Sequence, residues 1–266
     1  MFRTIRASDP RYERDALRCI TVKSPALRGR ADLSCFIPAG TAPLPLVILL
    51  HGVYGSHWSW SMKGGVHLTA QRLIDSGAIA PLAVAMPSDG LWGDGSGYLP
   101  HPDRDFERWI VEEVPAAVAL ENERVLADGP LAIGGLSMGG FGALRIGAKH
   151  GRRFRGVSGH SSITHFDQLA QFVEEPLETY RAQDADRSVL ETILRHADTL
   201  PALRFDCGLS DPLLADNRAL HAALERAGVP HTYEEFPGGH EWSYWERHIE
   251  TTLRFFDACF RDQSSS

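Results

Sequence analysis

The stretch from residue 131 to residue 150 constrains the fold of this chain more than any other. It opens with the apolar run Leu-Ala-Ile, passes through Gly-Gly-Leu-Ser-Met-Gly-Gly, and continues with helical spacing. A short apolar run bounded by glycines predicts a buried strand. Glycines two residues before and after Ser137 let a strand and a helix approach closely around a sharp turn. The segment therefore predicts a strand, a tight turn with Ser137 at its apex, and a helix.

The same alternation of strand and helix extends over most of the chain. Apolar runs predict strands, and segments with helical spacing lie between them. The strands are expected at residues 46–50, 80–86, 131–135, 154–158, 202–207 and 232–236, and the helices at 66–76, 105–122, 138–150, 213–227 and 241–260. Pro115 should break or kink the second helix. Residues 17–22 and 31–37 flank a turn and predict an antiparallel pair. The pattern predicts an α/β fold with a mainly parallel central sheet and helices on both faces.

One segment departs from this rhythm. Residues 165–199 are mixed, polar and partly helical. A small cap or lid over the carboxyl edge of the sheet has this character, and so does an ordinary insertion. A chain of 266 residues is otherwise an ordinary length for one large α/β domain, so a single domain over residues 1–266 is expected.

Composition and charge exclude several classes of function. Hydrophobic residues make up 43% and charged residues 23%, which predicts a packed core. A net charge of -7 argues against a nucleic-acid partner. The four cysteines are scattered and no H-E-x-x-H motif occurs, so neither a disulfide framework nor a metal site is expected, and no cofactor is implied. No apolar run is long enough to cross a membrane and no signal peptide is visible, so a cytoplasmic protein is expected. A homo-oligomer stays open.

Ser137 has the setting of a catalytic nucleophile. A serine hydroxyl needs a histidine base, and that histidine needs an acid to fix its tautomer. His240 is the best base, because it lies on a glycine-rich loop between the last strand and the last helix. Asp211 follows the preceding strand and is the expected acid, although it could simply cap the next helix. Asp206 is the nearest competitor, but it falls within the strand.

An oxyanion hole should lie beside this serine. Attack on an ester leaves a negative oxygen that needs two backbone N–H donors. Met138, directly after the serine, is one expected donor. Val53, on the loop after the first central strand, is the other, with Tyr54 as the alternative. His51 precedes that loop and is interpreted as a structural residue that holds it.

Aromatic residues at predicted loop positions are candidates for a substrate pocket. Tyr54, Trp92 and Trp242 are the expected substrate-binding residues, although aromatic side chains also pack loops onto a sheet. Three polar residues lie in a glycine-rich loop, and solvated loop polarity accounts for them better than substrate contact does. These three are Asp89, Asp94 and His101.

The chain also resembles a known family. The strings LLHGVYGSHWSW, GGLSMGGFGALRIG, CGLSDPLL and GGHEWSYW resemble the esterase D-like branch of the α/β-hydrolases, which includes tributyrin esterases, S-formylglutathione hydrolases, feruloyl esterases and mycolyltransferases. The resemblance runs from about residue 46 to residue 256. It implies the α/β-hydrolase fold, ester hydrolysis without a cofactor, and roles for Ser137, Asp211, His240, Val53 and Met138 as expected above. The oxyanion loop lacks the Leu-Thr-Cys-like run associated with S-formylglutathione hydrolases.

These observations predict a serine carboxylesterase that acts on short-chain or aryl esters of small molecules through an acyl-enzyme on Ser137. The same triad would also serve a mycolyltransferase-like acyltransferase or an S-formylglutathione-type thioesterase. A non-catalytic binding protein on the same fold is a further alternative.

Overall fold

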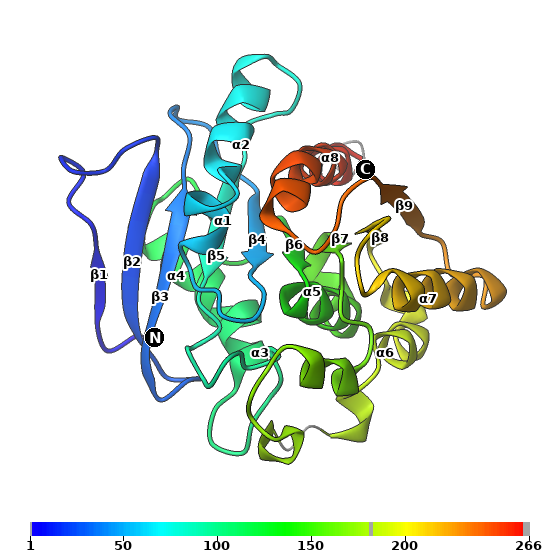
Figure 1. Cartoon of the computed structure of the whole chain (residues 1–266). Coiled ribbons are helices and arrows are strands. Elements are labelled where there is room, and N and C mark those ends of the chain that lie inside the picture. Colours follow the sequence, from blue (N-terminus) through cyan, green and yellow to red (C-terminus); the bar gives the residue numbers. More distant parts are fainter. Residues whose placement is uncertain (1, 181–182, 263–266) are drawn as a thin grey trace.

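The computed structural model describes residues 2–180 and 183–262. Within these ranges nine strands form one sheet, in the order β1-β2-β3-β5-β4-β6-β7-β8-β9 (Figure 1). The strands are β1 (Ile5–Ala7), β2 (Leu17–Ser24), β3 (Gly29–Phe36), β4 (Leu46–Leu50), β5 (Ala83–Pro87), β6 (Leu131–Leu136), β7 (Phe154–His160), β8 (Ala202–Gly208) and β9 (Thr232–Phe236). The α-helices are α1 (Ser59–Met62), α2 (Val66–Asp75), α3 (Phe106–Arg108), α4 (Val114–Glu121), α5 (Met138–Lys149), α6 (Val189–Arg195), α7 (Leu214–Arg226) and α8 (Trp242–Arg261).

The sheet has an antiparallel start and a parallel remainder. Strands β1, β2 and β3 pair antiparallel, and β3 joins β5 antiparallel. From β5 through β4, β6, β7 and β8 to β9, every neighbour is parallel. The loops that follow β4, β6, β8 and β9 therefore leave the sheet at one edge, because parallel strands end on the same side.

Helices cover both faces of the sheet, as the sequence predicts. Side chains of a strand alternate between faces, and β4 shows this directly. Leu46, Ile48 and Leu50 join a core cluster with residues of α4, α5, α6 and α7. Val47 and Leu49 join a second cluster with residues of α1, α2 and α8. A strand buried on both faces must be apolar at every position, which explains the unbroken run at 46–50.

The secondary-structure predictions are confirmed with local differences. All eight expected strands are present, and β1 is an additional short edge strand. The strand expected from residue 80 begins at Ala83. The segment expected as one helix over 105–122 consists of α3, a π-helical turn at Trp109–Glu113, and α4. Pro115 lies in the first turn of α4, where its missing N–H costs no helical hydrogen bond.

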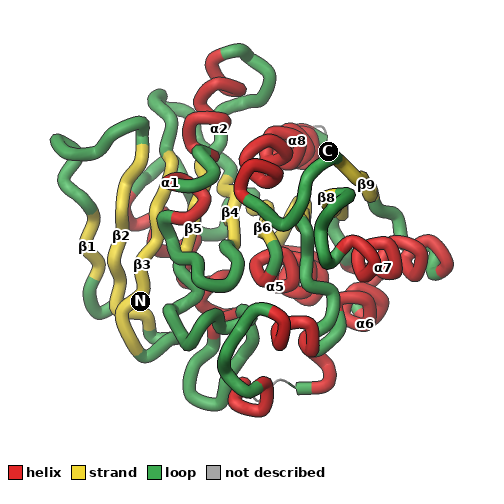
Figure 2. The backbone as a smooth tube through the Cα atoms, in the orientation of Figure 1, coloured by secondary structure: helices red, strands yellow, loops and turns green. Residues whose placement is uncertain are grey.

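The 165–199 segment is mostly loop with single helical turns (Figure 2). It contains three 3-10 turns at Phe166–Gln171, Asp184–Asp186 and Ala197–Thr199, a fourth at Leu177–Tyr180, and the short helix α6. Residues 181 and 182 of this segment, and residues 1 and 263–266 of the expected 1–266 domain, lie outside the described residues. Among the described helices, none combines the length and the apolar character needed to cross a membrane.

Candidate active site

Ser137 occupies a strained turn between β6 and α5. Its φ of +54° and ψ of -118° lie outside the regions that non-glycine residues favour. A Cβ atom on Gly135 would collide with the carbonyl oxygen of Gly139, and one on Gly139 would collide with that of Leu50. The two glycines therefore permit strand and helix to approach as the sequence predicts. Strain of this kind persists where the surrounding structure enforces it, and it raises the serine hydroxyl above the sheet edge.

His240 lies between Ser137 and Asp211. The His240 Nε2 atom is 3.0 Å from the Ser137 Oγ atom, and Nδ1 is 2.9 Å from the Asp211 Oδ2 atom. Asp211 accepts the Nδ1–H, which leaves Nε2 free to accept the serine proton. The carboxylate of Asp211 also accepts a hydrogen bond from the backbone N–H of Leu213 through its other oxygen, at 2.8 Å. Asp211 does not cap α7, because the N-cap residue of that helix is Leu213, and its contact with His240 fits the histidine-orienting interpretation.

Asp206, the competing acid, belongs to a separate buried network. It lies 3.0 Å from His160 and accepts hydrogen bonds from Arg204 and Tyr244, each at 2.8 Å. Burial by itself would raise the pKa of Asp206, but the positive charges and hydrogen bonds of these neighbours lower it. Among the described residues, Asp206 makes no hydrogen bond with His240, whose Nδ1 atom bonds Asp211 instead.

The two expected oxyanion donors have free N–H groups beside Ser137. Within the described chain, the backbone N–H groups of Val53 and Met138 make no hydrogen bond. Tyr54, the alternative donor, is excluded because its N–H donates to the carbonyl oxygen of Asp94 at 2.9 Å. The same Asp94 also holds the 165–199 segment, since its carboxylate accepts from the N–H of Glu174 and its N–H donates to Glu175.

The oxyanion loop is held from beneath by buried polar groups. His51 Nδ1 donates to the Gly52 carbonyl oxygen at 2.7 Å, and Nε2 accepts from the Asp89 N–H at 3.1 Å. The Tyr98 hydroxyl bonds both the N–H and the carbonyl oxygen of His51. Asp89 is only 2% exposed and accepts from the N–H groups of Leu91 and Ser96. The expectation of solvated loop polarity was wrong for Asp89, which is buried and forms hydrogen bonds within a turn. Asp94 connects the oxyanion loop with the 165–199 segment through its hydrogen bonds.

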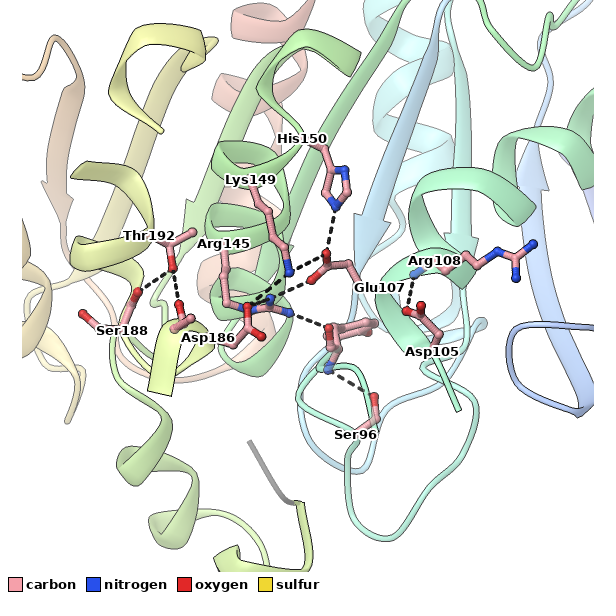
Figure 3. Close-up of polar contacts among 12 residues, drawn as sticks. Ser96, Asp105, Glu107, Arg108, Arg145, Lys149, His150, Asp186, Ser188 and Thr192 are labelled. Atoms are coloured by element: carbon pink, nitrogen blue, oxygen red, sulfur yellow. Dashed lines mark hydrogen bonds and ion pairs between the residues drawn. The ribbon is translucent and has the colours of Figure 1, made fainter. Parts of the chain in front are cut away.

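A buried ion-pair cluster anchors the loop after β5, which carries Tyr98, to α5. Figure 3 shows Arg145, Lys149 and His150 converging on Glu107, with Asp186 beside them. Arg145 is fully buried, pairs with Asp186 at 3.0 Å, and donates to the Tyr98 carbonyl oxygen at 2.6 Å. Burial would raise the pKa of Glu107, but its His150 hydrogen bond and the charges of Arg145 and Lys149 hold that pKa far below its usual value.

A cavity of about 290 Å³ opens at Ser137 and His240. Of the expected substrate-binding residues, Tyr54 and Trp242 line it. Trp92 lies elsewhere, with its ring edge-on to His101 and Tyr180 at centroid distances of 4.7 Å, because the loop after β5 folds back on the 165–199 segment.

Other residues also line the cavity wall. Phe172 stacks on the His240 ring at 5.4 Å, and Trp245 meets the same ring edge-on at 5.0 Å. Lys63 and Glu241 supply charge to the wall. Trp245 is an aromatic neighbour of His240 in the string GGHEWSYW, whereas no local signal marks Lys63 or Phe172. In the part of the chain that the structure describes, no cluster of three His, Cys, Asp or Glu side chains is arranged to bind a metal.

A parallel sheet of this order, with a strained serine after its central strand and a histidine after its last, defines the α/β-hydrolase class. Comparison with known proteins agrees. The family described as "Putative esterase" matches residues 24–256. An acetyl esterase of Caldicellulosiruptor saccharolyticus is 30% identical over 234 residues, which cover 80% of this chain and 83% of that relative.

Solved structures share the fold. An S-formylglutathione hydrolase of Staphylococcus aureus superposes with a TM-score of 0.77 at 20% identity, and a ferulic acid esterase with 0.76 at 23%. Each alignment covers 91% of this chain and 98% of the other. The chain belongs to this esterase family and is a serine hydrolase of the carboxylesterase type. The mycolyltransferase-like alternative is not favoured.

Proposed function

We propose that this chain hydrolyses short-chain acyl esters of small molecules through an acyl-enzyme on Ser137, with His240 as base and Asp211 as the acid that orients it. The observation that carries this proposal is the unbroken hydrogen-bond chain from Ser137 Oγ through His240 to Asp211, at 3.0 Å and 2.9 Å. Ser137 and His240 line a cavity whose size suits a small substrate.

The reaction proceeds in two half-reactions. His240 Nε2 accepts the proton of Ser137 as Oγ attacks the ester carbonyl carbon. The N–H groups of Val53 and Met138 stabilise the negative oxygen of the tetrahedral intermediate. His240 then returns the proton to the departing alcohol, which leaves an acyl group on Ser137. Water attacks this acyl-enzyme while His240 accepts its proton, and the carboxylic acid departs as Oγ is protonated again.

The size and lining of the cavity favour a substrate with a short or flat acyl group. At about 290 Å³ the space lies at the lower end of the range for small-molecule sites. Its apolar wall includes the aromatic side chains of Phe172, Trp242 and Trp245. Flat rings of this kind pack well against aryl groups, so aryl esters are the second substrate class. The acetyl esterase relative supports the short-chain reading. Phe172 comes from the 165–199 segment, which supports a cap role for that segment within the single domain.

The first test is hydrolysis of p-nitrophenyl acetate, butyrate and octanoate. We expect rates to fall with chain length, because the aromatic wall limits the acyl group. Ser137→Ala and His240→Ala should each reduce kcat/KM by about five to six orders of magnitude, since the residues act as a unit. An S-formylglutathione assay runs in parallel. Full activity in Ser137→Ala would exclude the proposed nucleophile, and preferential turnover of the thioester would replace the short-chain reading with a thioesterase.

A further inference from the structure

Lys63 brings an isolated positive charge to the wall of the Ser137 cavity. The residue follows α1, its side chain is exposed, and it lines the same cavity as Ser137 and His240. The Lys63 ammonium lies 6.0 Å from the centroid of the Trp58 ring and 5.7 Å from that of Trp242. Contacts of this length with ring faces are weakly attractive and keep the ammonium near the rings.

In the part of the chain that the structure describes, no carboxylate pairs with this charge. Among the described residues, Lys63 makes no ion pair. Lys149, by contrast, pairs with Glu107 at 3.0 Å and with Asp186 at 3.3 Å. A lysine that forms no ion pair at the wall of a cavity keeps its charge available to a ligand. The indole rings also exclude some water, which strengthens its attraction for an anion.

Glu241 is the other charged residue of the cavity wall, and its sign is opposite. It lies at the N-terminal end of α8, a helix of 20 residues. The positive end of the helix dipole partly offsets a carboxylate at that position. Lys63 caps the C-terminal end of α1, but that helix has only four residues and its dipole offsets the ammonium much less. The cavity wall therefore favours a negative group on the side of Lys63.

We propose that Lys63 is a specificity-determining residue that selects esters carrying an anionic group, such as a carboxylate, on their acyl or alcohol part. This inference rests on the proposed function of Ser137. The anionic group binds the ammonium while the reacting carbonyl lies at Ser137 Oγ. Trp242, which contacts the ammonium and lines the cavity, packs against the carbon skeleton between the two ends of the substrate.

Two pairs of esters test this assignment and tell the two sides of the substrate apart. The alcohol side is probed with p-acetoxybenzoate against its neutral methyl ester. The acyl side is probed with p-nitrophenyl hydrogen adipate against p-nitrophenyl methyl adipate. In each pair the ratio of kcat/KM for the anionic ester to that for the neutral ester is measured in the wild type, in Lys63→Met, and in the control Lys23→Met. Lys23 is an exposed lysine of β2, outside the cavity.

We expect the anionic-to-neutral ratio to fall about fivefold in Lys63→Met, in at least one pair, and to stay at the wild-type value in Lys23→Met. The wild-type ratio should also fall with added salt, because the ion pair between the Lys63 ammonium and the anionic group of the ester is partly exposed. Equal ratios in the wild type and Lys63→Met for both pairs would overturn the inference. So would a wild-type preference for an ester with a trimethylammonium group, which would mean that Glu241 dominates.

A binding measurement separates failure of this inference from failure of the proposed function. Benzoate and benzamide are titrated against the tryptophan fluorescence of each variant, since Trp58 and Trp242 flank the ammonium. We expect the ratio of the Kd for benzoate to that for benzamide to rise about fivefold in Lys63→Met. If neutral esters are hydrolysed but neither ratio moves, only the role of Lys63 fails. If no ester is hydrolysed while the Kd ratio moves, the esterase proposal fails and the anion site stands.

Discussion

The hydroxyl of Tyr98 satisfies both backbone polar groups of His51. It accepts a hydrogen bond from the His51 N–H at 3.1 Å and donates one to the His51 carbonyl oxygen at 3.2 Å. Burial raises the pKa of Tyr98 well above its usual value, so the hydroxyl keeps its proton and remains a donor. His51 directly precedes the oxyanion loop. The position of the proposed donor Val53 therefore depends on a side chain that arrives from a different loop.

Replacing Tyr98 by phenylalanine tests this dependence. Tyr98→Phe leaves a buried N–H and a buried carbonyl oxygen unpaired, at a cost of about 2 kcal/mol in the free energy of unfolding. Because the oxyanion loop loses its support, we expect kcat for p-nitrophenyl acetate to fall about tenfold with KM changed much less. Steady-state kinetics and urea denaturation measure the two effects.

Tyr180→Phe is the matched control. The Tyr180 hydroxyl is buried and has no hydrogen-bond partner among the described residues, so its removal should leave stability unchanged or slightly higher. A Tyr98→Phe variant with wild-type kcat would show that the loop keeps its position without the hydroxyl.

The two buried aspartates near His240 and His160 should separate catalysis from stability. Asp211→Asn keeps the shape of the side chain but favours the wrong tautomer of His240, so we expect kcat to fall by about three to four orders of magnitude. Asp206→Asn removes the negative charge that Arg204 and His160 face in the core, so we expect a loss of about 3 kcal/mol in unfolding free energy. Ester kinetics at a temperature where both variants are folded measure the first effect, and denaturant titration the second. A reversed pattern would make Asp206 the catalytic acid.

The glycines beside Ser137 should tolerate no side chain. A Cβ atom on Gly135 would overlap the backbone of Gly139, and neither strand nor helix can retreat without opening the turn. We expect Gly135→Ala to lose about 3 kcal/mol or more of unfolding free energy. Gly29→Ala is the control, because the nearest atom to its added Cβ is the Leu27 carbonyl oxygen at 3.6 Å, an ordinary contact. Thermal denaturation compares them, and equal Tm values would contradict the close approach.

The Glu107 cluster should make the fold sensitive to acid. The folded-state pKa of Glu107 lies well below its ordinary value of 4.5. A carboxyl with a lowered pKa contributes stability that is fully present above the unfolded-state pKa and is lost as the pH falls towards the folded-state pKa. We therefore expect the unfolding free energy to decrease steadily from about pH 5 downward, because the unfolded chain binds protons at Glu107 and Asp206 that the folded protein does not.

Urea titrations between about pH 5 and about pH 3 measure this slope. Glu107→Gln should have a shallower slope than the wild type, although it is less stable at every pH because Arg145 loses a partner. Glu246→Gln is the control, since Glu246 is exposed and makes no ion pair within the described chain. An identical slope in all three proteins would exclude Glu107 as a source of acid sensitivity.

The strands and helices were largely predictable because burial in the sheet requires a characteristic apolar pattern within each strand or helix. The run 46–50 is apolar at every position since β4 is covered on both faces. The glycines around Ser137 are also a local requirement of the turn. The edge strand β1 escaped prediction because it is short, at three residues, and only half-buried, so its side chains show little alternation. The π-helical turn before Pro115 likewise depends on packing and not on periodicity.

By itself the sequence determined the order of strands and helices and the serine turn, because these follow from spacing within short segments. It also proposed Ser137 and His240, and it preferred Asp211 to Asp206 without deciding between them. The tertiary structure decided the rest. The Val53 N–H is free, whereas that of Tyr54 donates to Asp94. Phe172 stacks on the His240 ring, and Trp92 packs against Tyr180 outside the cavity. The tertiary structure also brought Lys63 to the cavity wall. These placements depend on contacts between segments far apart in the chain, and such contacts leave no periodic pattern in the residues that make them.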